Sequence, residues 1–185
     1  MKIAPLLKDK QKRLVKNWME SLLAAYPPET RRFLTSQPDV FANPVGATLQ
    51  EEIESLLEWL IDQSHQDEVD KFLDKIIRIR AIQDMTIRQA LGFVFEIKAI
   101  TRKSLGRELT ENDHQDDLLI FDSRVDELAM RAFEVYARCR EEVHTIRVRE
   151  VERNTHLLLR RAKLVSYVPP DDGLQAEPDL TMDKD

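Results

Sequence analysis

The feature that most limits how this chain can fold is its C-terminal half, where residues 107–168 contain neither glycine nor proline. Those two residues are the ones that most often end a helix. A continuous helix over about 45 of these residues would be about 68 Å long, far longer than a four-helix core. We therefore expect the segment either to break or to project from a core and pair with a second chain.

Apolar and small side chains recur along this segment at alternating spacings of three and four, the heptad pattern of a helix that packs along one seam. The first run consists of Ala129, Ala132, Tyr136, Cys139, Val143 and Ile146. A second run keeps the rhythm in another frame and consists of Val148, Val151, Thr155, Leu158, Ala162 and Val165. The offset fits neither a stutter nor a stammer, so we expect a face change or a break near residues 146–149. The first run is the candidate dimer interface, in a parallel or an antiparallel pair.

The rest of the chain also favours helices, because only 4 of its 185 residues are glycine while 34% are charged and 42% are hydrophobic. Apolar residues at helical spacing predict helices over these ranges: residues 5–26, 44–62, 67–82 and 87–105. Asn43 before Pro44 is the expected N-cap of the second helix, and Thr86 with Gln89 forms a capping-box pattern before the fourth. Gly92 inside the fourth indicates a close helix crossing. The three residues after it are expected in the core: Phe93, Val94 and Phe95.

These patterns predict an all-α helical bundle with a long C-terminal helix projecting from it. We expect three parts: a helical domain over residues 1–140, a C-terminal helical extension over 141–168, and an acidic disordered tail over 169–185. Between the first two predicted helices, residues 29–42 are expected to be irregular, with at most one helical turn.

Charge is distributed unevenly along the chain. The net charge is −6, yet residues 138–163 carry eight basic and four acidic side chains, and the tail from Asp171 carries −5. A basic helix suits nucleic acid or an anionic membrane, but the acidic tail or an acidic protein partner would also neutralise it. We favour the second interpretation and expect no nucleic-acid partner. No window resembles a membrane span or signal peptide, and the single Cys139 fits a reducing compartment, so we expect a cytoplasmic protein.

Two sequence motifs have the spacing of di-iron ligands. Glu111 with His114, and Glu141 with His144, each place a carboxylate and an imidazole on one helical face. About 45 Å of helix would separate the two pairs, so they cannot converge within one chain. A cluster of acids at the same helix start suits the helix dipole as well as a hard cation: Glu111, Asp113, Asp116 and Asp117.

Other candidate chemistry is equally sparse. None of the four histidines lies in the middle of an apolar stripe, as a haem ligand usually does: His65, His114, His144 and His156. Cys139 is a member of the heptad run and is expected to be a small buried side chain rather than a nucleophile. Phosphate-binding loops and nucleophile elbows do not occur in the sequence. We therefore expect no catalytic residue, no cofactor and no bound metal.

Residues 18–46 read WMESLLAAYPPETRRFLTSQPDVFANPVG. This run, and above all its end, resembles the RsbRD-type N-terminal domain of RsbT co-antagonist proteins in the bacterial stressosome pathway; the motif residues are Phe41, Ala42, Asn43, Pro44, Val45 and Gly46. The resemblance extends over residues 8–140. It implies an all-helical, dimeric, sensor-like module without enzymatic activity, related to the haem-less globin-like domains of RsbR proteins.

The co-antagonists continue from this domain into a STAS domain with phosphorylatable residues. The sequence after Val168 has no alternating strand and helix pattern, so we expect a stand-alone form without a STAS domain. The expected function is a non-enzymatic regulatory module that dimerises and contacts an unknown protein partner. The alternative is a metal- or haem-binding helical protein with redox or gas-sensing chemistry, which metal analysis and an absorption spectrum would separate from the first.

Overall fold

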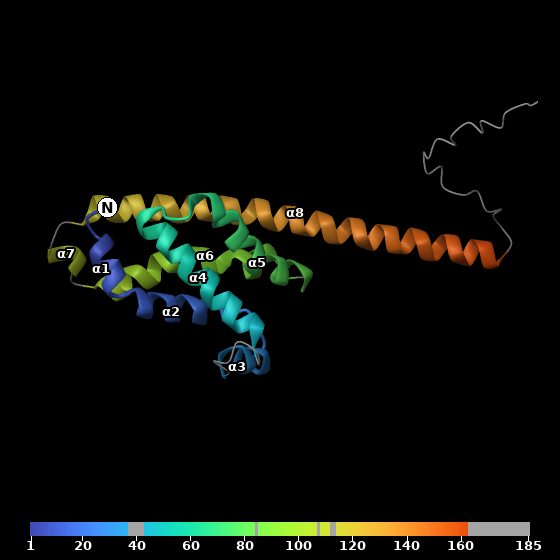
Figure 1. Ribbon diagram of the computed structural model, residues 1–185, viewed down its shortest axis with the longest axis horizontal. Coiled ribbons are helices and arrows are strands. Elements are labelled where there is room, and N and C mark those ends of the chain that lie inside the picture. The colour runs from blue at the N-terminus through green and yellow to red at the C-terminus, as the bar shows by residue number, and fades with distance from the viewer. Residues whose placement is uncertain (37–42, 84, 107, 112–113, 163–185) are drawn as a thin grey trace, which may run out of the picture. The chain divides into compact units, whose positions relative to one another are not determined.

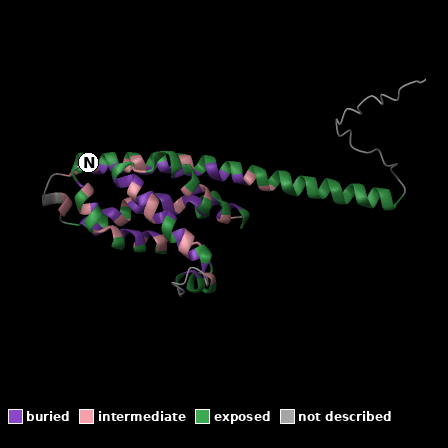
Figure 2. Cartoon of the chain, viewed as in Figure 1, coloured by how far each residue is buried: buried purple, intermediate pink, exposed green. Residues whose placement is uncertain are grey.

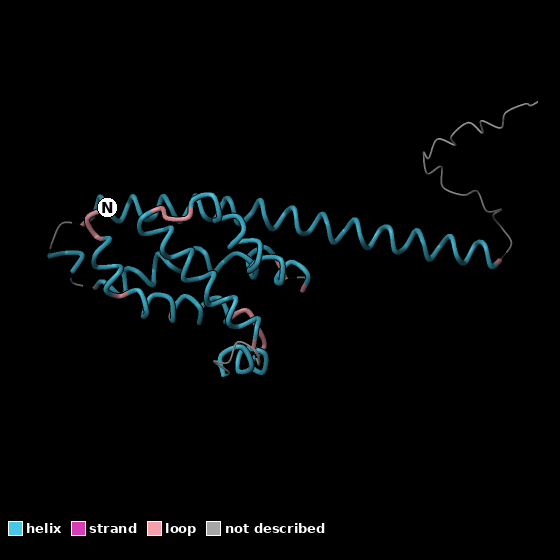
Figure 3. The backbone as a smooth tube through the Cα atoms, in the orientation of Figure 1, coloured by secondary structure: helices cyan, strands magenta, loops and turns pink. Residues whose placement is uncertain are grey.

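The computed structural model describes residues 1–36, 43–83, 85–106, 108–111 and 114–162. Every regular element among these residues is a helix, as Figure 3 shows, and the all-α prediction is confirmed. The helices are α1 (Ala4–Asp9), α2 (Gln11–Leu23), α3 (Pro28–Ser36), α4 (Pro44–Asp62), the 3-10 turn η1 (Gln66–Glu68), α5 (Val69–Ile82), α6 (Ile87–Leu105), α7 (Glu108–Glu111) and α8 (Gln115–Arg161). The chain divides into two compact units, Met1–His144 and Thr145–Asp185.

The N-terminal region differs from the sequence prediction in two places. The expected first helix is two helices, because the backbone leaves helical geometry at Lys10, with φ −96° and ψ 8°. The ammonium group of Lys10 donates to the carbonyl of Ser104 and forms a 2.7 Å ion pair with Glu108. The segment expected to be irregular contains α3. The apolar periodicity on which the prediction depended signals neither the break at Lys10, which coincides with contacts distant in sequence, nor α3.

The helix-start signals were read correctly. The side chain of Asn43 accepts a hydrogen bond from the backbone of Gly46 at the start of α4. At the start of α6, Thr86 and Gln89 form the reciprocal capping box. At its end, Gly106 adopts a φ of 51°, which a residue with a side chain would resist. The Asn43 and Thr86 contacts satisfy backbone donors that a helix leaves unpaired at its first turn.

The core of the first unit lies where α2, α4, α5 and α6 meet the N-terminal part of α8 (Figure 1). The indole nitrogen of Trp18, which has no exposed surface, donates to the carbonyl of Phe93 over 2.8 Å and so joins α2 to α6. From α8, Arg124 donates to the carbonyl of Ile61 over 2.8 Å. The buried residues gather on the facing sides of these helices in Figure 2.

Helix α8 is continuous from Gln115 to Arg161, so the predicted break near residues 146–149 does not occur. A break needs a residue that cannot continue the helix, and this segment contains no glycine or proline. The alternative that the sequence allowed, a change of face, stays a prediction. Residues 163–185, and with them Val165 and the expected acidic tail, lie outside the described residues.

Candidate functional site

The candidate dimer seam on α8 consists of six positions: Ala129, Ala132, Tyr136, Cys139, Val143 and Ile146. The first four are buried in the core of the first unit, and Ala132 has no exposed surface. The hydroxyl of Tyr136 donates to the carbonyl of Met85 over 2.8 Å. Val143 is half-buried, and Ile146 is 63% exposed. The seam is therefore corrected at its first four positions, which pack against the chain's own helices and are not free to meet a partner.

Cys139 is buried as expected, with 2% of its surface exposed. Its sulfur lies 3.9 Å from a carboxylate oxygen of Asp74. Burial raises the pKa of the Cys139 thiol, so the fraction of reactive thiolate at neutral pH falls. The surroundings are those of a structural cysteine.

The candidate metal-ligating residues whose side chains the structure describes do not gather. Among the residues that the structure describes, no group of three or more histidine, cysteine or acidic side chains is placed to hold a metal ion. Asp117 accepts a 2.7 Å hydrogen bond from the backbone of Ile3, which ties the start of α8 to the N-terminus. Asp116, Glu141 and His144 are exposed. The side chains of Glu111 and Asp113 lie outside the description.

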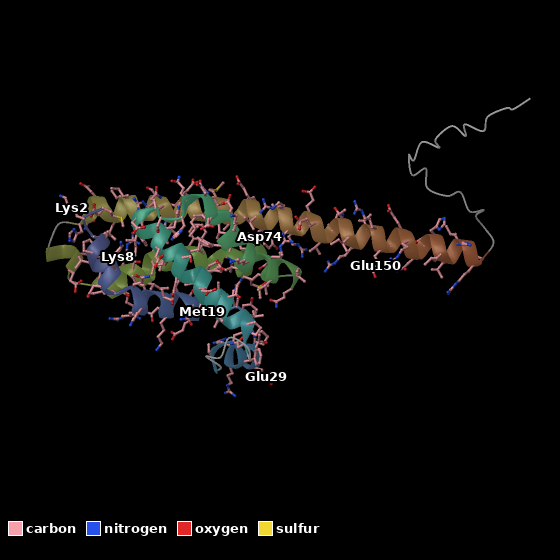
Figure 4. All side chains as sticks on the ribbon, viewed as in Figure 1. Lys2, Lys8, Met19, Glu29, Asp74 and Glu150 are labelled. Atoms are coloured by element: carbon pink, nitrogen blue, oxygen red, sulfur yellow. The ribbon has the colours of Figure 1, made fainter. Side chains whose placement is uncertain are left out.

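The second heptad run of α8 has surroundings unlike those of the first. Every described residue from 145 to 162 is exposed, and this part of α8 has the exposed colour throughout in Figure 2. Figure 4 shows side chains standing out from the helix around Glu150. Large apolar side chains are among them: Ile146 63%, Val148 40%, Val151 63%, Leu157 48%, Leu158 64% and Leu159 36% exposed. Such a concentration of exposed apolar surface is typical of an interaction site.

Residues 43–46 form a tight joint between α3 and α4. Asn43 is 1% exposed, and its amide nitrogen donates to the carbonyl of Leu34 over 2.9 Å while its amide oxygen accepts from the nitrogen of Gly46 over 2.9 Å. A Cβ on Gly46 would lie 2.6 Å from the Leu34 carbonyl oxygen, so the close approach requires glycine. Phe41 and Ala42 lie outside the described residues, and Val45 is exposed. The described part of the motif therefore has a structural role.

A second exposed apolar surface lies in the first unit, around a groove between α2, α6 and α8 with a volume of about 1080 Å³. Its lining includes four large apolar side chains that are roughly half exposed: Ile87, Phe95, Met130 and Phe133. The prediction that Phe95 is in the core was wrong, although Phe93 and Val94 are buried. Gly92 also lines the groove, and a Cβ there would meet nothing within 4 Å. Open space, and not a close helix crossing, surrounds this glycine.

Sequence reasoning missed Arg80, which lies in the wall of this groove and is only 1% exposed. Its signal was present in the periodicity of α5, because Arg80 falls four residues after Ile76 and three after Ile77 on the buried stripe. A basic residue on an apolar stripe is buried unless its helix turns away.

Comparison with known proteins gives a match to a protein family. The family described as RsbT co-antagonist protein rsbRD N-terminal domain matches residues 12–151. The chain belongs to this family. The resemblance based on the motif around Asn43 is thereby confirmed. No curated protein and no solved structure matches the chain at a significant level.

The RsbRD N-terminal domain match begins in α2 and ends within α8 at residue 151. It thus includes the α3–α4 joint, the groove beside α6 and the first two positions of the exposed heptad run, Val148 and Val151. In the part of the chain that the structure describes, no helix is long and apolar enough to cross a membrane. The family suggests a sensor-like domain of stress signalling.

Proposed function

We propose that this RsbRD-type chain is a non-enzymatic, cytoplasmic regulatory module that works as a parallel homodimer and relays a signal to a protein partner. The observation that carries the proposal is the exposed heptad run of α8. The family membership supports the signalling role. The second copy pairs with the first through Val148, Val151, Thr155 and Leu158.

The apolar surface of this run favours pairing. Val151 and Leu158 occupy equivalent positions seven residues apart, and both are more than 60% exposed. Burying a valine or leucine side chain is worth roughly 1.5 to 3 kcal/mol. A coiled-coil dimer buries each such residue twice, once in each copy, so the run favours pairing, and the polar Thr155 weakens this contribution only in part.

The charges beside the run favour the parallel orientation. With Val148 and Thr155 as a positions, Arg147 is a g position and Glu152 is the following e position. In a parallel, in-register pair these two side chains lie next to each other across the interface, with opposite charges. In an antiparallel pair centred on the same run, Arg147 instead meets Arg161 of the second copy, and the two Glu152 side chains meet each other.

The test uses the full chain and two leucines on adjacent positions of α8. Leu158 lies on the seam, whereas Leu157 is 48% exposed and lies off it. Leu158→Glu removes two buried leucines from the dimer, roughly 3 kcal/mol or more, so its dissociation constant should rise at least about a hundredfold. Leu157→Glu is the matched control and should leave the dimer intact. Light scattering across a concentration series measures both.

Orientation is tested by a cysteine on the seam. Thr155→Cys should cross-link under mild oxidation in a parallel pair, while His156→Cys, one position off the seam, should not. A wild-type chain that is monomeric at tens of micromolar, or equal dissociation by both leucine variants, would refute the proposed interface. Failure of the Thr155→Cys cross-link in an intact dimer would refute the parallel orientation.

A further inference from the structure

Arg80 carries a positive charge that no acidic side chain in the described ranges pairs with. Its guanidinium donates to the carbonyl of Leu22 over 2.9 Å and to the carbonyl of Gln89 over 2.5 Å. A guanidinium has five N–H donors, and the Nε–H of Arg80 is buried without a hydrogen-bond partner. Donating capacity therefore remains at a side chain that is 99% removed from water, being only 1% exposed.

No acidic side chain among the described residues forms an ion pair with Arg80. The guanidinium instead lies over the ring of Tyr26, 5.2 Å from its centroid, and over that of Phe93, at 5.4 Å. Burial lowers the pKa of Arg80, as expected for a charge removed from water. A buried charge is costly unless it is paired, and here the aromatic faces and two carbonyls offset the cost only in part.

The groove that Arg80 lines has the lining of a small-molecule site. Its volume of about 1080 Å³ slightly exceeds the roughly 300 to 1,000 Å³ of most ligand pockets, and apolar side chains dominate its lining. At its rim, Arg88 adds positive charge and Glu96 negative charge, while Asp126 is paired with Lys98 over 2.6 Å. Among the charged groups that line the groove, Arg80 is the buried one.

We propose that this groove binds a small amphipathic anion, such as a medium-chain monocarboxylate. The hydrocarbon chain lies over Phe95, Met130 and Phe133, and the carboxylate takes hydrogen bonds from Arg80. A planar carboxylate matches the fork of donors on a guanidinium, and the pairing is stronger in a site removed from water. The Nη2 group of Arg80 turns from the carbonyl of Gln89, in the first turn of α6, toward the ligand. The inference goes beyond the proposed dimer and does not depend on it.

The test is calorimetric titration of the full chain with decanoate below its micellar concentration. Saturable binding is expected, together with at least about tenfold weaker binding of decan-1-ol and of decyltrimethylammonium, which share the chain length but lack the negative charge. Arg80→Met should weaken decanoate binding at least about tenfold. Arg13→Met, the same change at an exposed position of α2 outside the groove lining, is the matched control and should retain binding.

A second variant leaves Arg80 in place. Gly92→Leu puts a side chain into open space in the groove, so it should abolish decanoate binding while the melting temperature stays the same or rises. This variant decides the outcome if Arg80→Met fails to fold. Absence of decanoate binding up to millimolar concentration, equal binding of decyltrimethylammonium, or full retention of binding in Gly92→Leu would each overturn the proposal.

Discussion

The same one-methyl change at two helical glycines should have opposite effects on stability. In Gly92→Ala the new Cβ meets nothing within 4 Å. The substitution should therefore recover the helix propensity that glycine forfeits, about 1 kcal/mol. In a chain of this size, a gain of about 1 kcal/mol corresponds to a melting temperature higher by about 2 to 4 °C.

Gly46→Ala should destabilise the protein. Its Cβ would lie 2.2 Å from the amide nitrogen of Asn43 and 2.6 Å from the carbonyl oxygen of Leu34. Both distances are too short, so the Asn43 side chain must move and abandon its hydrogen bonds to Gly46 and Leu34. Overpacking of about 1 to 3 kcal/mol and loss of a cap worth about 1 kcal/mol together give a cost of about 2 to 4 kcal/mol.

Urea denaturation followed by circular dichroism measures both changes, at one fixed protein concentration because the proposed dimerisation would make the apparent stability depend on it. The double variant Asn43→Ala with Gly46→Ala adds a check. Once the Asn43 side chain is gone, its two close contacts with the new Cβ are removed while the one with Leu34 remains, so adding Gly46→Ala should cost less than it does alone. A neutral Gly46→Ala would refute the account of the joint. A destabilising Gly92→Ala would mean that the groove is not open in solution.

Two further predictions concern titratable groups. The ammonium group of Lys8, 2.8 Å from Asp62, lowers the pKa of that carboxyl to about 2. The pair therefore contributes stability above the ordinary pKa of 3.8, and this contribution is lost as the pH falls through about 2. Asp62→Asn should lower the urea midpoint at pH 7 but leave it unchanged below pH 2. A lower midpoint that persists below pH 2 would contradict this reasoning. Cys139 should react with Ellman's reagent at least about a hundredfold more slowly in the native protein than in guanidinium, and should not cross-link on mild oxidation. Rapid labelling of Cys139, or a cross-link between two Cys139 residues, would show that the first heptad run is exposed at the protein surface.

Helix boundaries were predictable where a single side chain closes a local hydrogen bond. Asn43, Thr86 and Gln89 act within three residues along the chain, so their roles follow from spacing alone. The break at Lys10 depends instead on Ser104 and Glu108, which are more than ninety residues away in sequence. No local pattern encodes such a contact, and the prediction of one continuous helix failed there for that reason.

Glycine and arginine were harder to interpret than apolar residues. A glycine inside a helix has two opposite explanations, a close approach or open space, and the sequence pattern is the same for both. Gly46 has the first and Gly92 the second. Arg80 continues a buried stripe, but its charge suggested exposure, and only the tertiary packing against Tyr26 and Phe93 shows how the charge is accommodated.

The heptad pattern of α8 predicts which face of the helix is apolar, but not which chain covers that face. A repeat of three and four residues requires one face of a helix to be covered, but it does not say whether the cover is the same chain or another copy. The run from Ala129 to Cys139 is covered by the chain's own helices, whereas the run from Val148 to Leu158 is exposed. The change of frame between them is therefore a physical boundary. Before it, burial within the first unit satisfies the apolar face. Beyond it, none of the described residues covers the run from Val148 to Leu158, and the second copy of α8 that we propose as its occupant fits the apolar rhythm and the flanking charges.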